Sequence, residues 1–174
     1  SKYGAKGFYQ GPVAEALVKR VREAGGIISH EDLIKYKPVW REPLNFRYKN
    51  LNIYSMGPPS SGGICLGQIL KMIEPYNINQ YDHNSEKAIQ LIVEAERRSY
   101  SDRSKHLGDP DFNEIAHKQL ISSVYLNDRM KSFSFDLASQ SKEIQAGKIS
   151  WTESEETTHY SILDPEGNAI AVTT

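Results

Sequence analysis

The sequence is 174 residues long, which is enough for one domain, and its 39% content of hydrophobic residues suits a globular core. The 21 Lys and Arg residues nearly balance the 22 Asp and Glu residues, so a formal net charge of −1 gives no argument for binding nucleic acid or an anionic membrane surface. No apolar run approaches the ~20 residues of a transmembrane helix. The single cysteine, Cys65, excludes an internal disulfide, and its apolar neighbours indicate a buried structural thiol.

The N-terminal part of the sequence predicts two helices. Apolar residues recur at helical spacing over residues 12–24, with a proline in the first turn and Gly25-Gly26 as the stop. Ser29 and Asp32 are spaced as in a variant of the capping box, which opens a second, short helix over residues 30–36.

The next segment predicts a hairpin, a loop and a helix. Apolar and polar residues alternate over residues 39–56 on both sides of a Lys49-Asn50 turn, as in a β-hairpin. The Gly-, Pro- and Ser-rich loop 57–63 then leads into a helix from Ile64 to Glu74. Such a loop at a helix N-terminus could bind an anion through backbone N–H groups, whereas a tight structural turn is the simpler interpretation. The spacing of its glycines is not that of a P-loop or a dinucleotide fingerprint.

The longest predicted helix covers residues 85–105. The stripe of small and aliphatic residues expected to face the core comprises Ala88, Leu91, Ile92, Ala95 and Ser99. Glu94 and Arg98 are spaced to pair at i, i+4 on the solvated side. Further arginines interleaved with Glu96 and Asp102 predict a mixed charged surface rather than a basic patch.

The following region predicts a loop, a helix and a linker. Asp109 and Asp111 could bind a metal, but turn and capping roles are favoured because no third ligand lies at suitable spacing. A helix is predicted over residues 117–132, with an apolar side formed by Leu120, Val124 and Leu126. Residues 133–156 are rich in Ser, Lys, Gln and Glu and predict an exposed, mobile linker, with a short helical turn at 136–139.

The end of the chain predicts a second β-hairpin. Residues 157–163 alternate as a strand, Asp164–Asn168 is a strong turn sequence, and residues 169–173 resume as an apolar strand. The sequence ends at Thr174 within that second strand, so we expect a fragment of a longer protein.

Thr157 begins this hairpin directly after an acidic run, and one chemistry requires such an arrangement. A threonine released as a new amino terminus carries its nucleophile and its base on one residue, because an α-amine titrates near pH ~8. An ordinary threonine-rich strand is the alternative. His159 falls on the same face of the strand, where it could act on the Thr157 hydroxyl or serve as a packed, hydrogen-bonded support. The five histidines show no zinc-motif spacing.

Several motifs resemble those of one enzyme family. The sequence Thr-Thr-His-Tyr-Ser at residues 157–161, the loop Met56–Gly63, and the stretches Ala95-Glu96, Asp102–Ser104 and Leu107–Phe112 are similar to motifs of the γ-glutamyltransferase (γ-glutamyltranspeptidase) family. They occur in the family's order and at similar separations, and they cover essentially the whole chain. Members of that family are N-terminal nucleophile hydrolases.

This resemblance implies an α/β class fold with α+β layering, as part of a four-layer αββα sandwich. Residues 1–156 would form the C-terminal part of the large-subunit region, and residues 157–174 the first hairpin of the small subunit. By the same resemblance, Thr157 matches the catalytic nucleophile, and its α-amine acts as the base after cleavage. The bond between Glu156 and Thr157 matches the self-cleavage site, and His159 is expected to support the nucleophile.

The implied activity is γ-glutamyl transfer and hydrolysis of γ-glutamyl amides such as glutathione, with water or an amino acid or dipeptide as acceptor. The resemblance implies no metal or organic cofactor, and it implies a periplasmic or extracellular protein. Most substrate-binding residues would lie in the rest of the parent's large and small subunits, so the isolated chain is expected to be inactive. The alternatives are a cephalosporin (glutaryl) acylase of the same superfamily and a processing-deficient homologue without catalysis.

Overall fold

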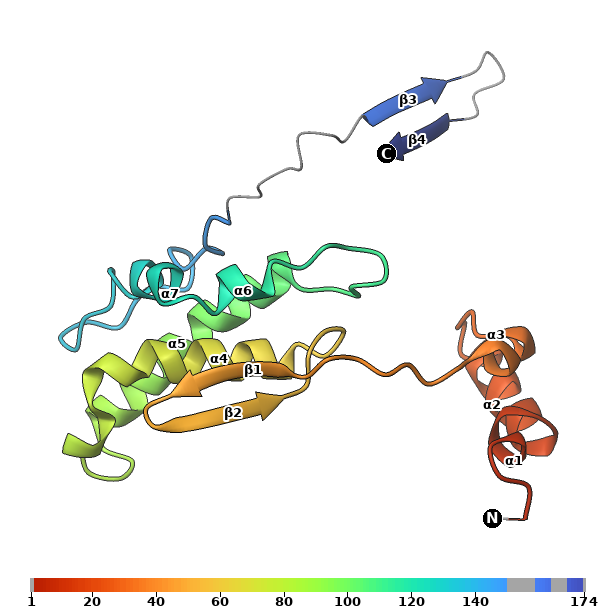
Figure 1. The fold of residues 1–174 in the computed structure, drawn as a ribbon, viewed down its shortest axis with the longest axis horizontal. Coiled ribbons are helices and arrows are strands. Elements are labelled where there is room, and N and C mark those ends of the chain that lie inside the picture. The colour runs from red at the N-terminus through yellow and green to blue at the C-terminus, as the bar shows by residue number, and fades with distance from the viewer. Residues whose placement is uncertain (1, 150–158, 164–168, 174) are drawn as a thin grey trace. The chain divides into compact units, whose positions relative to one another are not determined.

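The computed structural model of the chain describes residues 2–149, 159–163 and 169–173. It divides into two compact units, Ser1–Arg41 and Glu42–Thr174, each of which is described by itself. Helices and strands are mixed among the described residues, which confirms the mixed class (Figure 1). In chain order the elements are α1 (Lys6–Tyr9), α2 (Pro12–Glu23), α3 (His30–Lys35), β1 (Leu44–Tyr48), β2 (Leu51–Ser55), α4 (Gly62–Ile73), η1 (Glu74–Tyr76), η2 (Ile78–Gln80), α5 (Glu86–His106), α6 (His117–Leu120), α7 (Ser123–Arg129), β3 (His159–Leu163) and β4 (Ala169–Thr173).

In the first unit, α2 is the helix predicted over residues 12–24. Pro12 occupies its first turn, where a missing N–H costs nothing, and the helix buries Ala14 and Val18. Gly25 follows the helix with φ of +83°, a left-handed conformation that glycine adopts without steric penalty. The predicted stop is therefore confirmed.

Helix α3 begins with the predicted capping box. The backbone N–H of Asp32 donates to Oγ of Ser29 at 3.2 Å, and the N–H of Ser29 donates to the Asp32 carboxylate at 2.8 Å. The hydrogen bond from the Ser29 hydroxyl, with a smaller effect from the Ser29 N–H, holds the pKa of Asp32 below its usual range. The sequence therefore fixes this helix start through local hydrogen bonds alone.

In the second unit, β1 and β2 form the hairpin predicted within residues 39–56. Their antiparallel register pairs Tyr48 with Leu51 across the Lys49-Asn50 turn. Leu44 and Phe46 on β1 are buried, in agreement with the predicted alternation. The strand packs them against α4.

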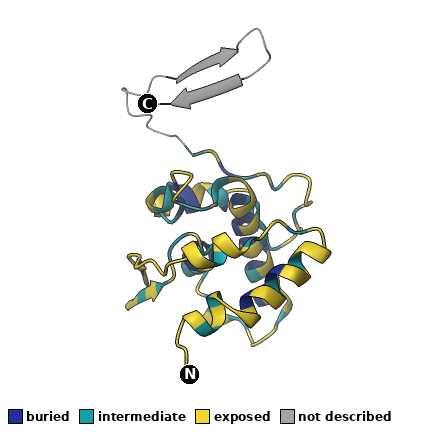
Figure 2. Ribbon diagram, turned by 90° about the vertical axis from the view of Figure 1, so that its right-hand side faces the viewer, coloured by how far each residue is buried: buried dark blue, intermediate teal, exposed yellow. Residues whose placement is uncertain are grey.

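Helices α4 and α5 pack against each other and contribute to one core. Helix α4 begins at Gly62, two residues before the predicted start, and it buries Cys65 as a free thiol, as predicted. A Cβ atom on Gly67 would lie 3.2 Å from the ring of Phe46, so glycine allows β1 to approach the helix closely. The buried core residues, which are among those drawn dark blue in Figure 2, are Leu44, Phe46, Ile64, Met72, Ile73, Leu91, Ala95, Ile115, Leu120, Tyr125, Leu126 and Met130.

The charged residues of α5 correct one prediction. Glu94 and Arg98 do pair at i, i+4, but only 2% and 1% of their surfaces are exposed, and Asp102 is 1% exposed. The predicted solvated side is therefore wrong at these positions, because the three residues follow one another at i, i+4 and continue the buried face. The buried members of the predicted apolar stripe are Ala88, Leu91, Ala95 and Ser99.

The single helix predicted over residues 117–132 is also wrong, because the chain forms two shorter helices, α6 and α7. Ser122 between them has extended backbone angles, and its Oγ accepts a hydrogen bond from the N–H of Tyr125 at 3.4 Å. This new N-cap restarts the helical period, so Tyr125 is buried while Val124 is 85% exposed. The predicted apolar residues that are buried are Leu120 and Leu126.

Residues 133–149, the described part of the predicted linker 133–156, are attached to the helices. Many of these residues are exposed, as predicted, but Gly147 is buried. The helical turn predicted at 136–139 is wrong, because the chain only bends there. The residues of this segment that pack against the core are Phe133, Phe135 and Ile149.

Strands β3 and β4 form the predicted C-terminal hairpin. They are antiparallel, with His159 opposite Thr173 and Leu163 opposite Ala169. The predicted turn at 164–168 lies outside the described residues. Among the helices that the structure describes, none has the length and apolar content needed to cross a membrane.

Candidate functional site

Two of the three predicted site residues, Glu156 and Thr157, lie outside the described residues. His159 is the first residue of β3, and its backbone lies opposite Thr173 of β4. The strand predicted to start at the nucleophile is therefore described from its third residue onward. The rest of the candidate site is the set of family-like motifs in the second unit.

Two of these motifs meet through one side-chain hydrogen bond. Nε of Arg103, on α5, donates to Oγ of Ser61 in the Gly- and Ser-rich loop at 2.9 Å, although 42 residues separate the two. A hollow of about 280 Å³ lies at this junction. Its lining residues are Pro59, Ser61, Arg103, Ser104, Leu107 and Gly108.

The loop before α4 is a tight structural turn, which is the simpler of the two predicted interpretations. A Cβ atom on Gly63 would overlap the backbone carbonyl oxygen of Met56, so the residue must be glycine for the helix to pass this close to the end of β2. The N–H of Gly62 donates to Oγ of Ser60 at 3.3 Å within the loop. The peptide bond between Pro58 and Pro59 is cis.

Asp109 has the predicted turn role, because its Oδ1 accepts a hydrogen bond from the N–H of Asp111 at 3.0 Å. Across the described ranges, no group of three or more His, Cys, Asp or Glu side chains is placed to hold a metal ion. Metal binding by these aspartates therefore has no support in the described geometry.

Asp102, from the same motif as Arg103, is the centre of a buried hydrogen-bond network. Its Oδ2 accepts from Nε2 of Gln68 at 3.0 Å and from the hydroxyl of Tyr125 at 2.8 Å. Its Oδ1 accepts from the backbone N–H of Gly147 at 2.8 Å and lies 3.1 Å from NH2 of Arg129. Burial, together with the Asp102 charge and hydrogen bond, raises the pKa of Tyr125, so the phenol stays a donor at neutral pH.

Glu94 is the centre of a second buried network, about two turns before Asp102 on α5. Its carboxylate accepts from Arg98 at 2.5 Å, from Arg97 at 2.8 Å, and from both the hydroxyl (2.6 Å) and the N–H (3.0 Å) of Ser139. Burial alone would raise the pKa of Glu94, but the hydrogen bonds from Ser139 and Arg98 outweigh it and hold that pKa below its usual value. Glu94 is therefore an ionised structural group rather than a free acid or base.

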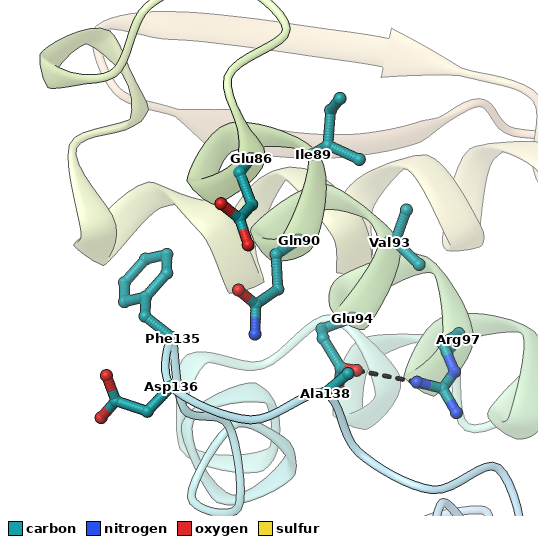
Figure 3. A pocket seen from close by; sticks show the side chains of 9 residues that line it. All are labelled: Glu86, Ile89, Gln90, Val93, Glu94, Arg97, Phe135, Asp136 and Ala138. Carbon is teal, nitrogen blue, oxygen red and sulfur yellow. Dashed lines mark hydrogen bonds and ion pairs between the residues drawn. The ribbon is translucent and has the colours of Figure 1, made fainter.

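A hollow of about 490 Å³ lies where Glu94 meets the segment after α7 (Figure 3). Figure 3 shows Gln90 and Glu94 directed from α5 toward the segment that carries Phe135 and Ala138, with Arg97 paired to Glu94. The residues that line the hollow are Glu86, Ile89, Gln90, Val93, Glu94, Arg97, Phe135, Asp136 and Ala138. Glu94 and Arg97 on its wall already bond to each other and to Ser139, so these two side chains have a structural role in the hollow.

The sequence matches the family model described as γ-glutamyltranspeptidase over residues 1–174. The chain belongs to the γ-glutamyltranspeptidase family. It is 42% identical over 170 residues to the "Glutathione hydrolase proenzyme" of Escherichia coli (strain K12), an alignment that covers 98% of this chain and 29% of that protein. It is 32% identical over 170 residues to the "Acylase ACY 1 proenzyme" of Pseudomonas sp. (strain V22), covering 98% of this chain and 30% of that protein.

Among solved structures, the crystal structure of Helicobacter pylori γ-glutamyltranspeptidase is similar to the chain with a TM-score of 0.74 and 38% identity. The similarity covers 88% of this chain and 44% of that one. The resemblance carried by the sequence motifs is therefore confirmed, and the mixed fold is that of a γ-glutamyltranspeptidase segment. The chain spans less than a third of the length of the two curated relatives.

The two buried networks of this γ-glutamyltranspeptidase segment were missed by sequence reasoning, although a signal existed. Residues 91, 95, 98 and 102 follow one another at spacings of four, three and four, which is the spacing of a buried helical stripe. Counting only small and aliphatic residues ends the predicted stripe at Ser99 and assigns the charged residues to the surface. A charged residue at a stripe position, with a partner at i+4, would have indicated burial in a hydrogen-bonded network.

Proposed function

We propose that the full-length protein is a γ-glutamyltransferase that hydrolyses and transfers the γ-glutamyl group of amides such as glutathione. The observation that carries this proposal is the 42% identity, over 98% of the chain, to a protein named glutathione hydrolase proenzyme. The family match over residues 1–174 supports the same activity class. The similarity to H. pylori γ-glutamyltranspeptidase further supports a complete four-layer αββα sandwich in the whole protein.

In the proposed mechanism, Thr157 supplies both the nucleophile and the base. Its α-amine accepts the hydroxyl proton while the oxygen attacks the γ-carbonyl carbon of the donor. The C–N bond of the amide breaks, and the leaving amine takes that proton. The resulting γ-glutamyl ester on Thr157 passes to water, which gives glutamate, or to an acceptor amine, which gives a new γ-glutamyl amide. His159, two residues along the same strand, is assigned a supporting role.

Thr157 obtains its free amine by cleavage of the bond to Glu156. Its hydroxyl attacks the Glu156 carbonyl, which converts the amide into an ester, and water then hydrolyses the ester to a Glu156 carboxylate and a free Thr157. The names of both curated relatives include the word "proenzyme", which supports processing in this family. In this proposal residues 1–156 end the large subunit and residues 157–174 begin the small one.

An acylase that prefers a glutaryl-cephalosporin is the second candidate. The sequence identities support it less than they support the γ-glutamyltransferase. Identity to the acylase ACY 1 proenzyme is 32%, compared with 42% to the glutathione hydrolase proenzyme, over alignments of equal length. A processing-deficient homologue is the third candidate, and it would keep the bond between Glu156 and Thr157 intact.

One experiment on the full-length protein distinguishes these three candidate functions. We expect the purified, processed protein to release the chromophore from a γ-glutamyl anilide, and glycyl-glycine to increase the rate as acceptor. Intact-mass analysis of the same sample should give a small subunit that begins at Thr157. A processed protein that cleaves a glutaryl-cephalosporin but leaves the anilide untouched would make it an acylase, and an intact chain without activity would make it a non-catalytic homologue.

A further inference from the structure

The segment that precedes the proposed cleavage site lies along α5 in a regular register. We call residues 134–147 the strap. Nε2 of Gln90 donates to the carbonyl of Ser134 at 2.9 Å, and four residues further along α5, Glu94 accepts from Ser139. The strap and the helix therefore run in the same direction, side by side.

The register continues to the C-terminal end of α5. The hydroxyl of Ser101 donates to the carbonyl of Ile144 at 3.2 Å. Asp102 accepts from the N–H of Gly147 at 2.8 Å, and Nε2 of His106 lies 2.8 Å from the carbonyl oxygen of the same glycine. NH1 of Arg97 donates to the carbonyl of Ser139 at 2.7 Å. The contacts at helix positions 90, 94, 97 and 101 follow one another at spacings of four, three and four, so one face of α5 is a docking track for the strap.

Gly147, at the C-terminal end of the strap, is anchored to α5. It is buried, and both its N–H and its carbonyl are bonded to α5 side chains. A Cβ atom at this position would overlap the hydroxyl of Tyr125 and would lie 2.7 Å from Cδ of Arg129. Glycine is therefore required for the strap to reach Asp102.

This contact determines how much chain is available to the proposed scissile bond. Nine residues lie between Gly147 and Thr157. Even in a fully extended chain, the ten steps from Gly147 to Thr157 span no more than about 35 Å, at ~3.5 Å per residue. The position at which Gly147 is fixed therefore limits where the bond between Glu156 and Thr157 can lie.

We propose that Asp102 and Gly147 are positioning residues for self-cleavage, because they fix the point from which the chain enters the cleavage site. The inference rests on the proposed function, in which Thr157 cleaves its own precursor. Asp102 acts indirectly, through its hydrogen bond from the N–H of Gly147, rather than on the reacting atoms. After cleavage the strap stays docked on α5, and the new C-terminus is Glu156, nine positions after Gly147 in the sequence.

The test compares cleavage rates of full-length variants, followed by intact mass after a pulse of cell-free synthesis. Gly147→Ala should cleave at least about tenfold more slowly than wild type, because a 1 Å displacement of reacting groups costs on the order of 10²-fold. Lys148→Ala changes an exposed neighbour and should cleave like wild type. Ser139→Ala removes a strap contact upstream of Gly147 and should also stay within about twofold, because Gly147 remains fixed.

A second arm bypasses cleavage by co-expressing residues up to Glu156 and a separate chain that begins at Thr157 after removal of its initiator methionine. In this arm Gly147→Ala should regain wild-type kcat, since a positioning role ends once the bond is cut. Equal cleavage of Gly147→Ala and wild type would overturn the inference, as would an equal loss of kcat in the bypassed form, which indicates a merely structural role. A wild-type protein that never cleaves would overturn the proposed function, and this inference with it.

Discussion

NH1 of Arg98 lies 2.5 Å from Oε2 of Glu94, and both side chains are only 2% exposed. A buried ion pair is stable only when its remaining hydrogen-bonding groups are also satisfied. Here Nε of Arg98 donates to the carbonyl of Arg129 and NH2 donates to Ser132, so the guanidinium connects α5 to the end of α7. The pair therefore holds two helices together as well as the strap.

Replacement of Arg98 by methionine should lower the free energy of unfolding by about 3 kcal/mol, because it leaves the Glu94 charge buried with fewer partners. The matched control is Arg97→Met on the same helix. Arg97 also pairs with Glu94, but its side chain is 26% exposed, so its loss should cost only about 1 kcal/mol. Urea denaturation in the Thr157→Ala background, where the proposed cleavage cannot occur, measures both values. Equal losses would show that burial of the pair is energetically unimportant.

The same pair predicts a pH dependence. Because the pKa of folded Glu94 is depressed, its contribution to stability is fully present above the ordinary glutamate pKa of about 4.3 and is lost as the pH falls through the lower folded value. Glu94→Gln cannot titrate at this position. The stability advantage of wild type over Glu94→Gln, from urea midpoints measured between pH 7 and pH 3, should therefore shrink below about pH 5. A gap that widens on acidification would contradict the direction of the shift.

Local patterns predicted most of the elements that form. The capping box at Ser29 and the alternation around the Lys49-Asn50 turn each depend on neighbouring residues, and both are confirmed. The helix break at Ser122 was missed because the residues around it also fit one continuous helical period. The hydrogen bond from the N–H of Tyr125 to Oγ of Ser122 favours two short helices over one long helix. Local information was sufficient where one conformation clearly satisfied the backbone groups.

The buried networks depended on contacts that a local pattern does not contain. Asp102 accepts from Gln68, Tyr125 and Gly147, which are 34, 23 and 45 residues away. The composition of the strap, with three Ser and two Gln among its residues, is that of an exposed linker. Its docking on α5 depends on the complementary side chains of that helix. For Thr157 the prediction rests on the family motif, because Thr157 lies outside the described residues, which resume at His159.

Two adjacent glycines of the loop before α4 should respond differently to alanine. Gly63→Ala should lower the free energy of unfolding by about 1–3 kcal/mol, because its Cβ would overlap the Met56 carbonyl oxygen, a backbone atom that cannot rotate away. A Cβ atom on Gly62 would meet only Oγ of Ser60, at an ordinary 3.5 Å, so Gly62→Ala should be neutral or slightly stabilising. Thermal unfolding of the two variants checks this, and equal stability would mean that the loop shifts freely.

The proposed base predicts how activity depends on the amino terminus. If the α-amine of Thr157 accepts the hydroxyl proton, activity should fall on acidification below an apparent pKa typical of an amine rather than a carboxylate. Acetylation of that amine in the processed protein should abolish turnover without changing the unfolding temperature. Turnover that persists after acetylation, with modification verified by mass, would assign the base role to His159 or another group.

Self-cleavage is the most direct test of whether Thr157 is the nucleophile. In the precursor its nitrogen is part of an amide and cannot act as the base, so the hydroxyl must attack the Glu156 carbonyl directly. That amide-to-ester shift is uphill, and it requires a fold that holds the two groups together and stabilises the developing oxyanion. The 174-residue chain alone should therefore stay at its intact mass of 19.7 kDa, while the full-length protein splits between Glu156 and Thr157. Thr157→Ala should block splitting, and Thr157→Ser should retain part of it because a hydroxyl remains. N-terminal sequencing over a time course measures this, and a Thr157→Ala protein that still yields a subunit starting at residue 157 would mean that another protease makes the cut.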